Sequence, residues 1–204
     1  MKTNGFGSLV EFLQHIFQSN WLGRSRIDME HNFDAFVVKN KIRATKLSKH
    51  FTIAETVKSE TAIRKSIDNT PDNQVISNLT ALCKNIMEPI REHYGIPIRV
   101  TSGYRCVQLN RAIGGSSRSQ HCALNGDAAI DFEFYDMSVD LEKVFLWITR
   151  ESKLPFDQCI AEFLPTGWIH ISYSSDGDNR KKITRAEKIN GKTRYVQLGN
   201  ADWA

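Results

Sequence analysis

The feature that most constrains the fold is a stripe of apolar residues that recurs every three or four positions in the first half of the chain. This spacing places the side chains on one face of a helix, which packs against a core. The segment Thr70-Pro71-Asp72 is a helix start signal, with Thr70 as the cap and Pro71 as the first helical residue. Gly95 predicts the end of the helix, and Pro89, inside it, predicts a kink. The stripe consists of Val75, Ile76, Leu79, Leu82, Cys83, Ile86, Met87 and Ile90.

The second half of the chain carries strand patterns. From Ala128 to Phe134 the side chains alternate between two faces, as in a strand. Asn190-Gly191 lies between two further strand-like segments and is the strongest short signal for a hairpin. Because helices come first and mostly antiparallel strands later, the sequence predicts an α+β domain with a mainly antiparallel sheet and helices on one side. The expected strands are 96–101, 128–134, 158–164, 168–173, 183–189 and 192–198, and two short helices are expected at 109–113 and 141–150.

The first 45 residues predict an arm with one amphipathic helix, followed by a compact domain at residues 46–204. Apolar residues recur at helical spacing in Ser8–Phe17, but polar residues interrupt them. The segment is too short to span a bilayer, and it lacks the basic start and cleavage site of a secretory signal. We therefore expect a protein that is made in the cytoplasm without a signal peptide and is not stably inserted in a membrane.

Composition and charge argue against several classes of function. The chain has 204 residues, of which 41% are apolar and 25% charged, as in an ordinary globular protein. A net charge of +4 is too small to indicate nucleic-acid binding, and no basic face with interleaved aromatic residues is visible. None of the cysteines forms a Cys-x-x-Cys pair, so neither a zinc ribbon nor a thioredoxin-like site is expected, and the thiols should be reduced and mostly buried. The cysteines are Cys83, Cys106, Cys122 and Cys159.

Two histidines and two acids carry the candidate chemistry: His121, Asp131, Glu162 and His170. Neutral imidazoles and a carboxylate are ligands that zinc prefers, and a catalytic zinc site uses three protein ligands and leaves one position for water. A hydrolase also needs a base near that water, usually a carboxylate that does not bind the metal. The other histidines are expected to be ordinary surface or hydrogen-bonded residues: His15, His31, His50 and His93.

The register of one hairpin supports this grouping. If Pro165-Thr166-Gly167 is a three-residue loop with its glycine in the left-handed conformation, Leu164 faces Trp168 and Glu162 faces His170. The Cβ atoms of a directly opposed pair lie roughly 4.5–5.5 Å apart on one face of a sheet. A metal ligand and a base would then face the same cleft.

Four motifs in a fixed order carry a family resemblance, which covers residues 46–198. They resemble the zinc D-Ala-D-Ala carboxypeptidase family, which includes phage endolysins and shares its fold with the Hedgehog signalling domain. Leu47-Ser48-Lys49-His50-Phe51 and the long helix resemble the phage-encoded branch. The motifs are Thr101-Ser102-Gly103-Tyr104-Arg105, Ser119-Gln120-His121, Gly126-Asp127-Ala128-Ala129-Ile130-Asp131-Phe132 and Trp168-Ile169-His170-Ile171-Ser172.

The resemblance implies one zinc ion held by His121, Asp131 and His170. It also implies that Glu162 is the acid beside the metal. Arg105 would bind a substrate carboxylate or carbonyl oxygen, for which its fork of donors is suited. Ser119 is expected with Arg105 among the substrate-binding residues.

The chain departs from the family pattern at one point. Three extra residues separate His121 from Asp131, so Asp127 is a rival ligand. Asp131 is preferred because the segment 128–133 keeps the strand character that the family has there.

The expected function is therefore zinc-dependent cleavage of a D-alanine-containing stem peptide of peptidoglycan, by a phage or prophage enzyme that acts on the cell wall. The family contains carboxypeptidases and endopeptidases, and both remain open here. The alternative is a non-catalytic module of the same fold, which binds zinc for recognition or serves as a phage structural part. Release of peptides from peptidoglycan, with and without a chelator, discriminates between the two.

Overall fold

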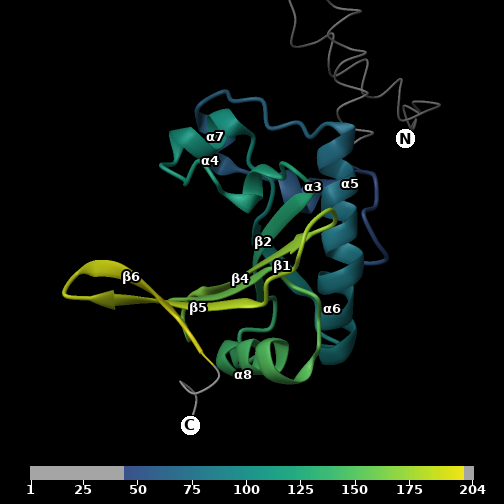
Figure 1. The fold of residues 1–204 in the computed structure, drawn as a ribbon. Coiled ribbons are helices and arrows are strands. Elements are labelled where there is room, and N and C mark those ends of the chain that lie inside the picture. Colours follow the sequence, from purple (N-terminus) through teal and green to yellow (C-terminus); the bar gives the residue numbers. More distant parts are fainter. Residues whose placement is uncertain (1–43, 200–204) are drawn as a thin grey trace, which may run out of the picture. The chain divides into compact units, whose positions relative to one another are not determined.

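A computed structural model describes residues 44–199, which fold as an α+β structure around a six-stranded sheet (Figure 1). The compact unit described here begins at Thr45. The amphipathic helix predicted in Ser8–Phe17 lies outside the described residues. Within the described range, no helix has the length and apolar content that crossing a membrane requires.

The described elements agree in order and type with most of the predicted ones. The strands are β1 (Ile98–Ser102), β2 (Asp127–Phe134), β3 (Gln158–Glu162), β4 (Trp168–Ser174), β5 (Lys182–Ile189) and β6 (Lys192–Gln197). The helices are α3 (Ile53–Val57), α4 (Glu60–Arg64), α5 (Asn73–Leu82), α6 (Glu88–Tyr94), α7 (Val107–Ala112) and α8 (Leu141–Leu146). A 3-10 turn, η2, spans Gln120–Cys122, and π-helical turns span Cys83–Met87 and Trp147–Glu151.

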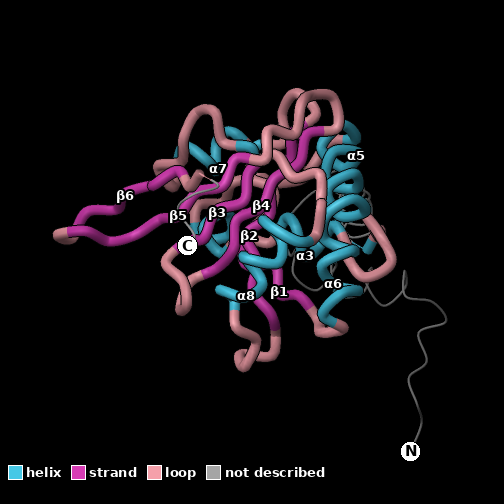
Figure 2. Tube along the Cα trace, turned by 60° about the horizontal axis from the view of Figure 1, so that its bottom comes forward, coloured by secondary structure: helices cyan, strands magenta, loops and turns pink. Residues whose placement is uncertain are grey.

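The strands are arranged in the order β1-β2-β4-β3-β5-β6 (Figure 2). All neighbours are antiparallel except β3 and β5. This parallel pair arises because β3 and β4 form a hairpin and the chain then returns to place β5 on the other side of β3. The predicted α+β class with a mainly antiparallel sheet is therefore confirmed, with one parallel pair that the sequence did not indicate.

The predicted long helix consists of α5, the π-helical turn and α6 in succession. Its cap is Asp72, whose carboxylate accepts a 2.8 Å hydrogen bond from the backbone N–H of Val75, so the prediction of Thr70 as cap was wrong. Gly95 ends the helix at a φ of 67°, as expected. The π-helical turn ends at Met87, two residues before Pro89, whose missing N–H and bulky ring disturb the regular hydrogen-bond ladder.

The two faces of the sheet differ in chemistry. One face is apolar and packs on α5 and α8, which contact the central strands. The other face presents polar side chains from the same strands, because successive residues point to opposite sides. Fully buried residues of the apolar face include Ile130, Phe132, Cys159, Ala161, Ile169 and Ile171.

The β3–β4 hairpin differs from its predicted register. Glu162 pairs with Trp168, and Ile160 pairs with His170. The loop therefore has five residues, and the N–H of Gly167 donates to the carbonyl of Phe163 at 3.1 Å. Gly167 is required for space and not for a left-handed φ, because a Cβ there would lie 1.8 Å from the carbonyl oxygen of Glu162.

The β5–β6 hairpin forms as the sequence predicts. Asn190 and Gly191 have φ values of 52° and 74°, and Ile189 pairs with Lys192 across a two-residue turn. Positive φ at both central residues is the requirement of the turn that matches the twist of a hairpin. The hairpin extends beyond the rest of the sheet (Figure 1).

Candidate metal centre

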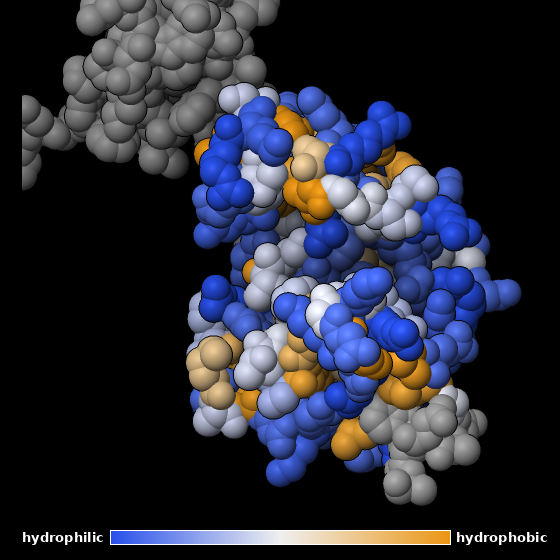
Figure 3. Space-filling view, turned by 90° about the vertical axis from the view of Figure 1, so that its left-hand side faces the viewer, coloured by the Kyte–Doolittle hydropathy of each residue, from blue (hydrophilic) through white to orange (hydrophobic). Residues whose placement is uncertain are grey.

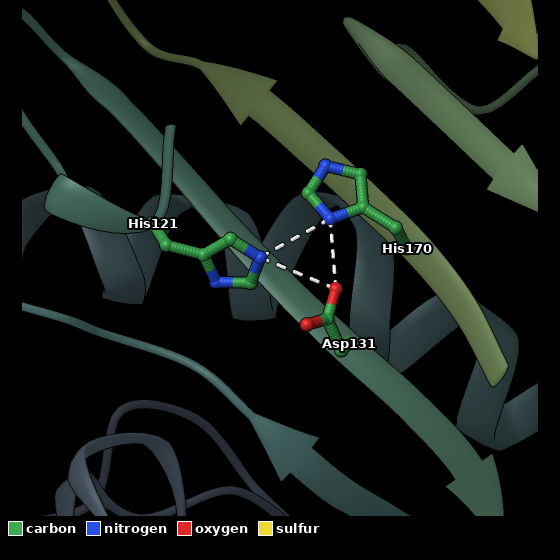
Figure 4. A group of neighbouring side chains, drawn as sticks. All are labelled: His121, Asp131 and His170. Atoms are coloured by element: carbon green, nitrogen blue, oxygen red, sulfur yellow. Dashed lines mark hydrogen bonds and ion pairs between the residues drawn. The ribbon is translucent and has the colours of Figure 1, made fainter. Parts of the chain in front are cut away.

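Three side chains from separate parts of the chain converge on the polar face of the sheet (Figure 4). His170 lies on β4 directly opposite Asp131 on β2, and its Nδ1 is 2.8 Å from Asp131 Oδ1. His121, on η2, places its Nε2 3.2 Å from the same oxygen and 3.2 Å from His170 Nδ1. Of the described residues, these three form the group of histidine and acid side chains that could hold a metal ion.

The separations of these atoms fit a zinc ion. Zinc forms bonds of about 2.0–2.1 Å to nitrogen and oxygen, so the ligand atoms of a tetrahedral site lie roughly 3.3 Å apart. The observed triangle, with sides of 2.8, 3.2 and 3.2 Å, is close to this size. All three residues are buried or nearly so, and a fourth direction stays available toward the cleft described below.

A backbone carbonyl determines which nitrogen of His121 faces the cluster. Nδ1 of His121 donates to the carbonyl oxygen of Gly103 at 2.7 Å. In a neutral imidazole the other nitrogen then carries the lone pair, and here it faces the carboxylate of Asp131. A lone pair and a carboxylate oxygen at 3.2 Å repel each other unless a cation or a proton lies between them. Ligating histidines are commonly oriented by such a carbonyl, so the arrangement suits a bound cation.

The electrostatics of the cluster favour the protonation states that a metal requires. Burial lowers the pKa of His121, which favours the neutral imidazole, although Asp131 opposes this effect. Burial by itself would raise the pKa of Asp131, but in the absence of a metal an imidazole of His121 or His170 that carries a proton toward this carboxyl holds its pKa well below the usual range. A neutral imidazole beside an ionised carboxylate is the ligand state that zinc binds.

Arg105 completes one side of the site. Its Nη2 donates to Asp131 Oδ2 at 2.9 Å, while Nε and Nη2 donate to Ser102 Oγ at 3.0 and 2.7 Å. The backbone N–H of Arg105 also donates to the carbonyl of His121 at 2.9 Å. The predicted substrate-binding arginine is thus brought to the cluster, where Ser102 and Asp131 fix its orientation.

Glu162 lies on the same face of the sheet as the cluster. It is on β3, one strand beyond His170, and its direct partner on β4 is Trp168, two residues from His170. The predicted direct pairing with His170 was wrong, but the alternation of strand residues keeps both side chains on one face. Glu162 is only 9% exposed, and burial raises its pKa above the usual range of a carboxyl group. A carboxylate with a raised pKa is suited to accept a proton near neutral pH.

The cluster opens onto a cleft of about 1160 Å³. The molecule is visibly hollowed on the face that Figure 3 shows. Ser119, the other predicted substrate-binding residue, lines this cleft with its neighbour Gln120. On the opposite side the wall includes Thr193 and Tyr195 of β6. Such an open, polar groove can accept an extended peptide.

The structure distinguishes between the two candidate acidic ligands, Asp131 and Asp127. Asp131 is opposite His170, whereas Asp127 is opposite Ser174 at the start of β2. Four residues of a strand span about 13 Å, so Asp127 lies too far along β2 to share an ion with His170. Asp127 lines the cleft but does not belong to the cluster. The ligand role of Asp131 remains a prediction, and the geometry favours it over Asp127.

Several supporting residues were not found from the sequence. Ser102 and Gly103 orient Arg105 and His121, although both lie in a motif that was recognised. Asp157, which is 2% exposed, accepts hydrogen bonds from Arg180 and from Gln120, next to His121. No short motif marks these contacts, because the partners lie far apart in the chain.

The other described histidines contact side chains away from the cluster, and the cysteines form no disulfide. His50 is 2.7 Å from a carboxylate oxygen of Glu88, and His93 stacks on Trp147. His15 and His31 lie outside the described residues. All four cysteines are free thiols and three of them are buried.

Comparison with known proteins gives one family match. The family model Peptidase M15 matches residues 49–172, which include the three residues of the cluster together with Arg105 and Glu162. A search of curated proteins gives no match.

Proposed function

Because the chain belongs to the Peptidase M15 family, whose members are zinc-dependent peptidases, we propose that it hydrolyses a D-alanine-containing stem peptide of bacterial peptidoglycan. In this proposal His121, Asp131 and His170 hold one zinc ion, Glu162 is the base and Arg105 binds the substrate. The observation that carries the proposal is the convergence of the three ligand atoms in a group that opens onto a large cleft.

The roles of the side chains follow from their positions. His121, Asp131 and His170 would hold a zinc ion, whose Lewis acidity would polarise a peptide carbonyl and make a water molecule more acidic. Glu162 faces the same side of the sheet, accepts the proton of the attacking water and passes it to the leaving amine. Its burial supports this role, because a raised pKa makes the carboxylate a stronger base.

Arg105 has two possible roles at the substrate, and they correspond to two reactions. Its Nε and Nη2 atoms are engaged by Ser102 and Asp131, which leaves Nη1 of the fork for a ligand. Contact with the free carboxylate of a terminal D-alanine would serve a carboxypeptidase. Contact with the scissile carbonyl oxygen, where negative charge develops, would serve an endopeptidase equally well.

The same proposal includes a further substrate contact and the place where the enzyme acts. Ser119 lines the cleft and is proposed to contact the peptide beside Arg105. A peptidoglycan substrate implies action on the cell wall. The resemblance of 47–51 to the phage-encoded branch supports a phage or prophage enzyme that is made in the cytoplasm.

The test uses zinc-loaded protein and purified peptidoglycan, with and without a chelator. Mass spectrometry of the soluble fraction should detect stem-peptide fragments or free D-alanine only when zinc is present, and Glu162→Gln should abolish most of the release. The identity of the product distinguishes carboxypeptidase from endopeptidase. Stoichiometric zinc binding without any release would contradict the proposal and favour a non-catalytic module.

A further inference from the structure

A row of paired residues connects Glu162 to the projecting hairpin. Glu162 on β3 pairs with Ala186 on β5, and Ala186 pairs with Tyr195 on β6. Directly paired residues point to the same face of a sheet in both parallel and antiparallel ladders. Tyr195 therefore shares the face of the cleft with Glu162, two strands away.

The small side chain of Ala186 makes contact across this row possible. Neighbouring strands lie about 4.8 Å apart, so the backbones of Glu162 and Tyr195 are separated by roughly 10 Å. A tyrosine can cover most of that distance only if the residue between offers no bulk. Ala186 is 1% exposed, as expected if larger side chains cover it. The phenol oxygen of Tyr195 reaches to 3.5 Å from Glu162 Oε2.

The two side chains differ in their access to solvent. Tyr195 is 60% exposed, whereas Glu162 is 9% exposed. The phenol therefore approaches the buried carboxylate from the open side of the cleft. Its O–H donates to Oε2, and among the described residues this is the one side chain that donates a hydrogen bond to Glu162. A donor on one oxygen fixes the orientation of the carboxylate and leaves the other oxygen for a second partner.

The hairpin that carries Tyr195 lies outside the residues that match the family model, which end at 172. Strand pairing places it beside the cleft, because β5 pairs with β3 over five residues and the Asn190-Gly191 turn sets the register of β6. The contact is therefore a property of this chain that membership of the family does not supply.

We propose that Tyr195 is a positioning residue, which holds the carboxylate of Glu162 from the far wall of the cleft so that its other oxygen can receive a proton. This inference rests on the proposed function, in which Glu162 is the base. It assigns the β5–β6 hairpin a part in the reaction and not only in the shape of the cleft.

Tyr195→Phe in the zinc-loaded protein tests the proposal, with peptidoglycan stem peptide as substrate. At 3.5 Å the hydrogen bond is long, so its removal should lower kcat by a modest factor of about five to twenty. Because a donor stabilises the ionised carboxylate, its loss should also move the acidic limb of the kcat/KM profile upward by at least about 0.3 pH unit. In a Glu162→Gln background the same change should have less than about a twofold effect.

Two further variants separate positioning from a general structural role. Ala186→Leu keeps the phenol but fills the space over which it reaches, so it should reproduce the loss of kcat. Tyr135→Phe removes the hydroxyl of another exposed tyrosine, 66% exposed and outside the cleft, and should behave as the wild type. Zinc affinity should be unchanged, within about twofold, in all three single variants.

A measurement without turnover distinguishes a failure of this inference from a failure of the proposed function. The ¹³C shift of the Glu162 carboxyl, followed against pH in the zinc-loaded protein, should give a higher pKa in Tyr195→Phe than in the wild type. If no peptide is cleaved but this difference is found, the proposed function fails and the positioning contact stands. If the wild type cleaves peptide while Tyr195→Phe matches Tyr135→Phe in kcat, pH profile and carboxyl pKa, the positioning role is wrong.

Discussion

The ion pair between Asp157 and Arg180 should make a measurable contribution to stability beside the candidate site. Asp157 is 2% exposed and receives Arg180 Nε on Oδ1 at 2.7 Å and Arg180 Nη2 on Oδ2 at 2.5 Å. The backbone N–H of Arg180 and the amide of Gln120 also donate to the same carboxylate. Arg180→Ala removes the two charge-assisted hydrogen bonds and leaves the other two in place.

The expected loss of stability in Arg180→Ala depends on the hydrogen bonds that Asp157 keeps. Breaking a buried pair can cost about 3–5 kcal/mol when one charge is left without a partner. Here Asp157 keeps two donors, and the Arg180 side chain is 57% exposed, so water compensates part of the loss. We therefore expect Arg180→Ala to lower the free energy of unfolding by about 2 kcal/mol at pH 7, or roughly 4–8 °C in Tm.

The pH dependence of the free energy of unfolding provides a second check of the role of the Asp157–Arg180 pair. Burial by itself would raise the pKa of Asp157, but the hydrogen bonds from Arg180 and Gln120 give a net lowering of the pKa. A lowered folded-state pKa gives stability that is present above the unfolded value, about 3.9, and is lost as the pH falls through the folded value. The difference between wild type and Arg180→Ala should thus be constant from about pH 5 to 8 and shrink below about pH 4.

Urea unfolding followed by circular dichroism at several pH values measures this difference, with Arg111→Ala on the exposed face of α7 as the control. A difference below about 0.5 kcal/mol at pH 7, which is typical of surface changes, would refute the reasoning. So would a difference of 2 kcal/mol that is as large at pH 3 as at pH 7.

Three further predictions concern the residues around the metal centre. Gly103→Ala would put a Cβ 2.3 Å from a backbone oxygen of α3, so the carbonyl that orients His121 must move, and zinc titration should show an affinity about 10–100-fold weaker. Gly167→Ala would put a Cβ 1.8 Å from the carbonyl oxygen of Glu162, and thermal melting should show a loss of about 1–3 kcal/mol. Glu162→Gln should lower kcat by about 10²–10⁴-fold with zinc still bound. Because burial raises the pKa of Glu162, the activity of the wild type should be lost, as the pH falls, at a higher pH than if this carboxyl were exposed. Unchanged zinc affinity, an unchanged melting curve or full turnover, respectively, would contradict these three expectations.

Much of the fold was predictable because local patterns determine it. The apolar stripe and Gly95 located the long helix, and Asn190-Gly191 located the β5–β6 hairpin. The cap was assigned to Thr70 although Asp72 provides it, because both residue types are good caps and only the position of the first turn decides between them. The helices α3 and α4 were missed because five-residue helices are too short to show a periodic pattern.

Non-local geometry was harder to predict. The β3–β4 register was wrong because the role of Gly167 depends on the approach of the Glu162 carbonyl, which no local pattern reveals. The grouping of His121 and His170 came from the order of motifs, and the structure brings both to Asp131. The contact of Tyr195 with Glu162 depends on strand order, since β5 lies beside β3 and not beside β4.

The most direct test of the account measures zinc binding by wild type and four single variants. Isothermal titration with metal analysis should find one zinc ion per chain, and His121→Ala, Asp131→Ala and His170→Ala should each weaken binding by at least about 100-fold. Asp127→Ala should bind within about threefold of wild type, because it lies outside the cluster. If the wild type binds no zinc, or if Asp127→Ala loses the metal while Asp131→Ala keeps it, the proposed centre is wrong.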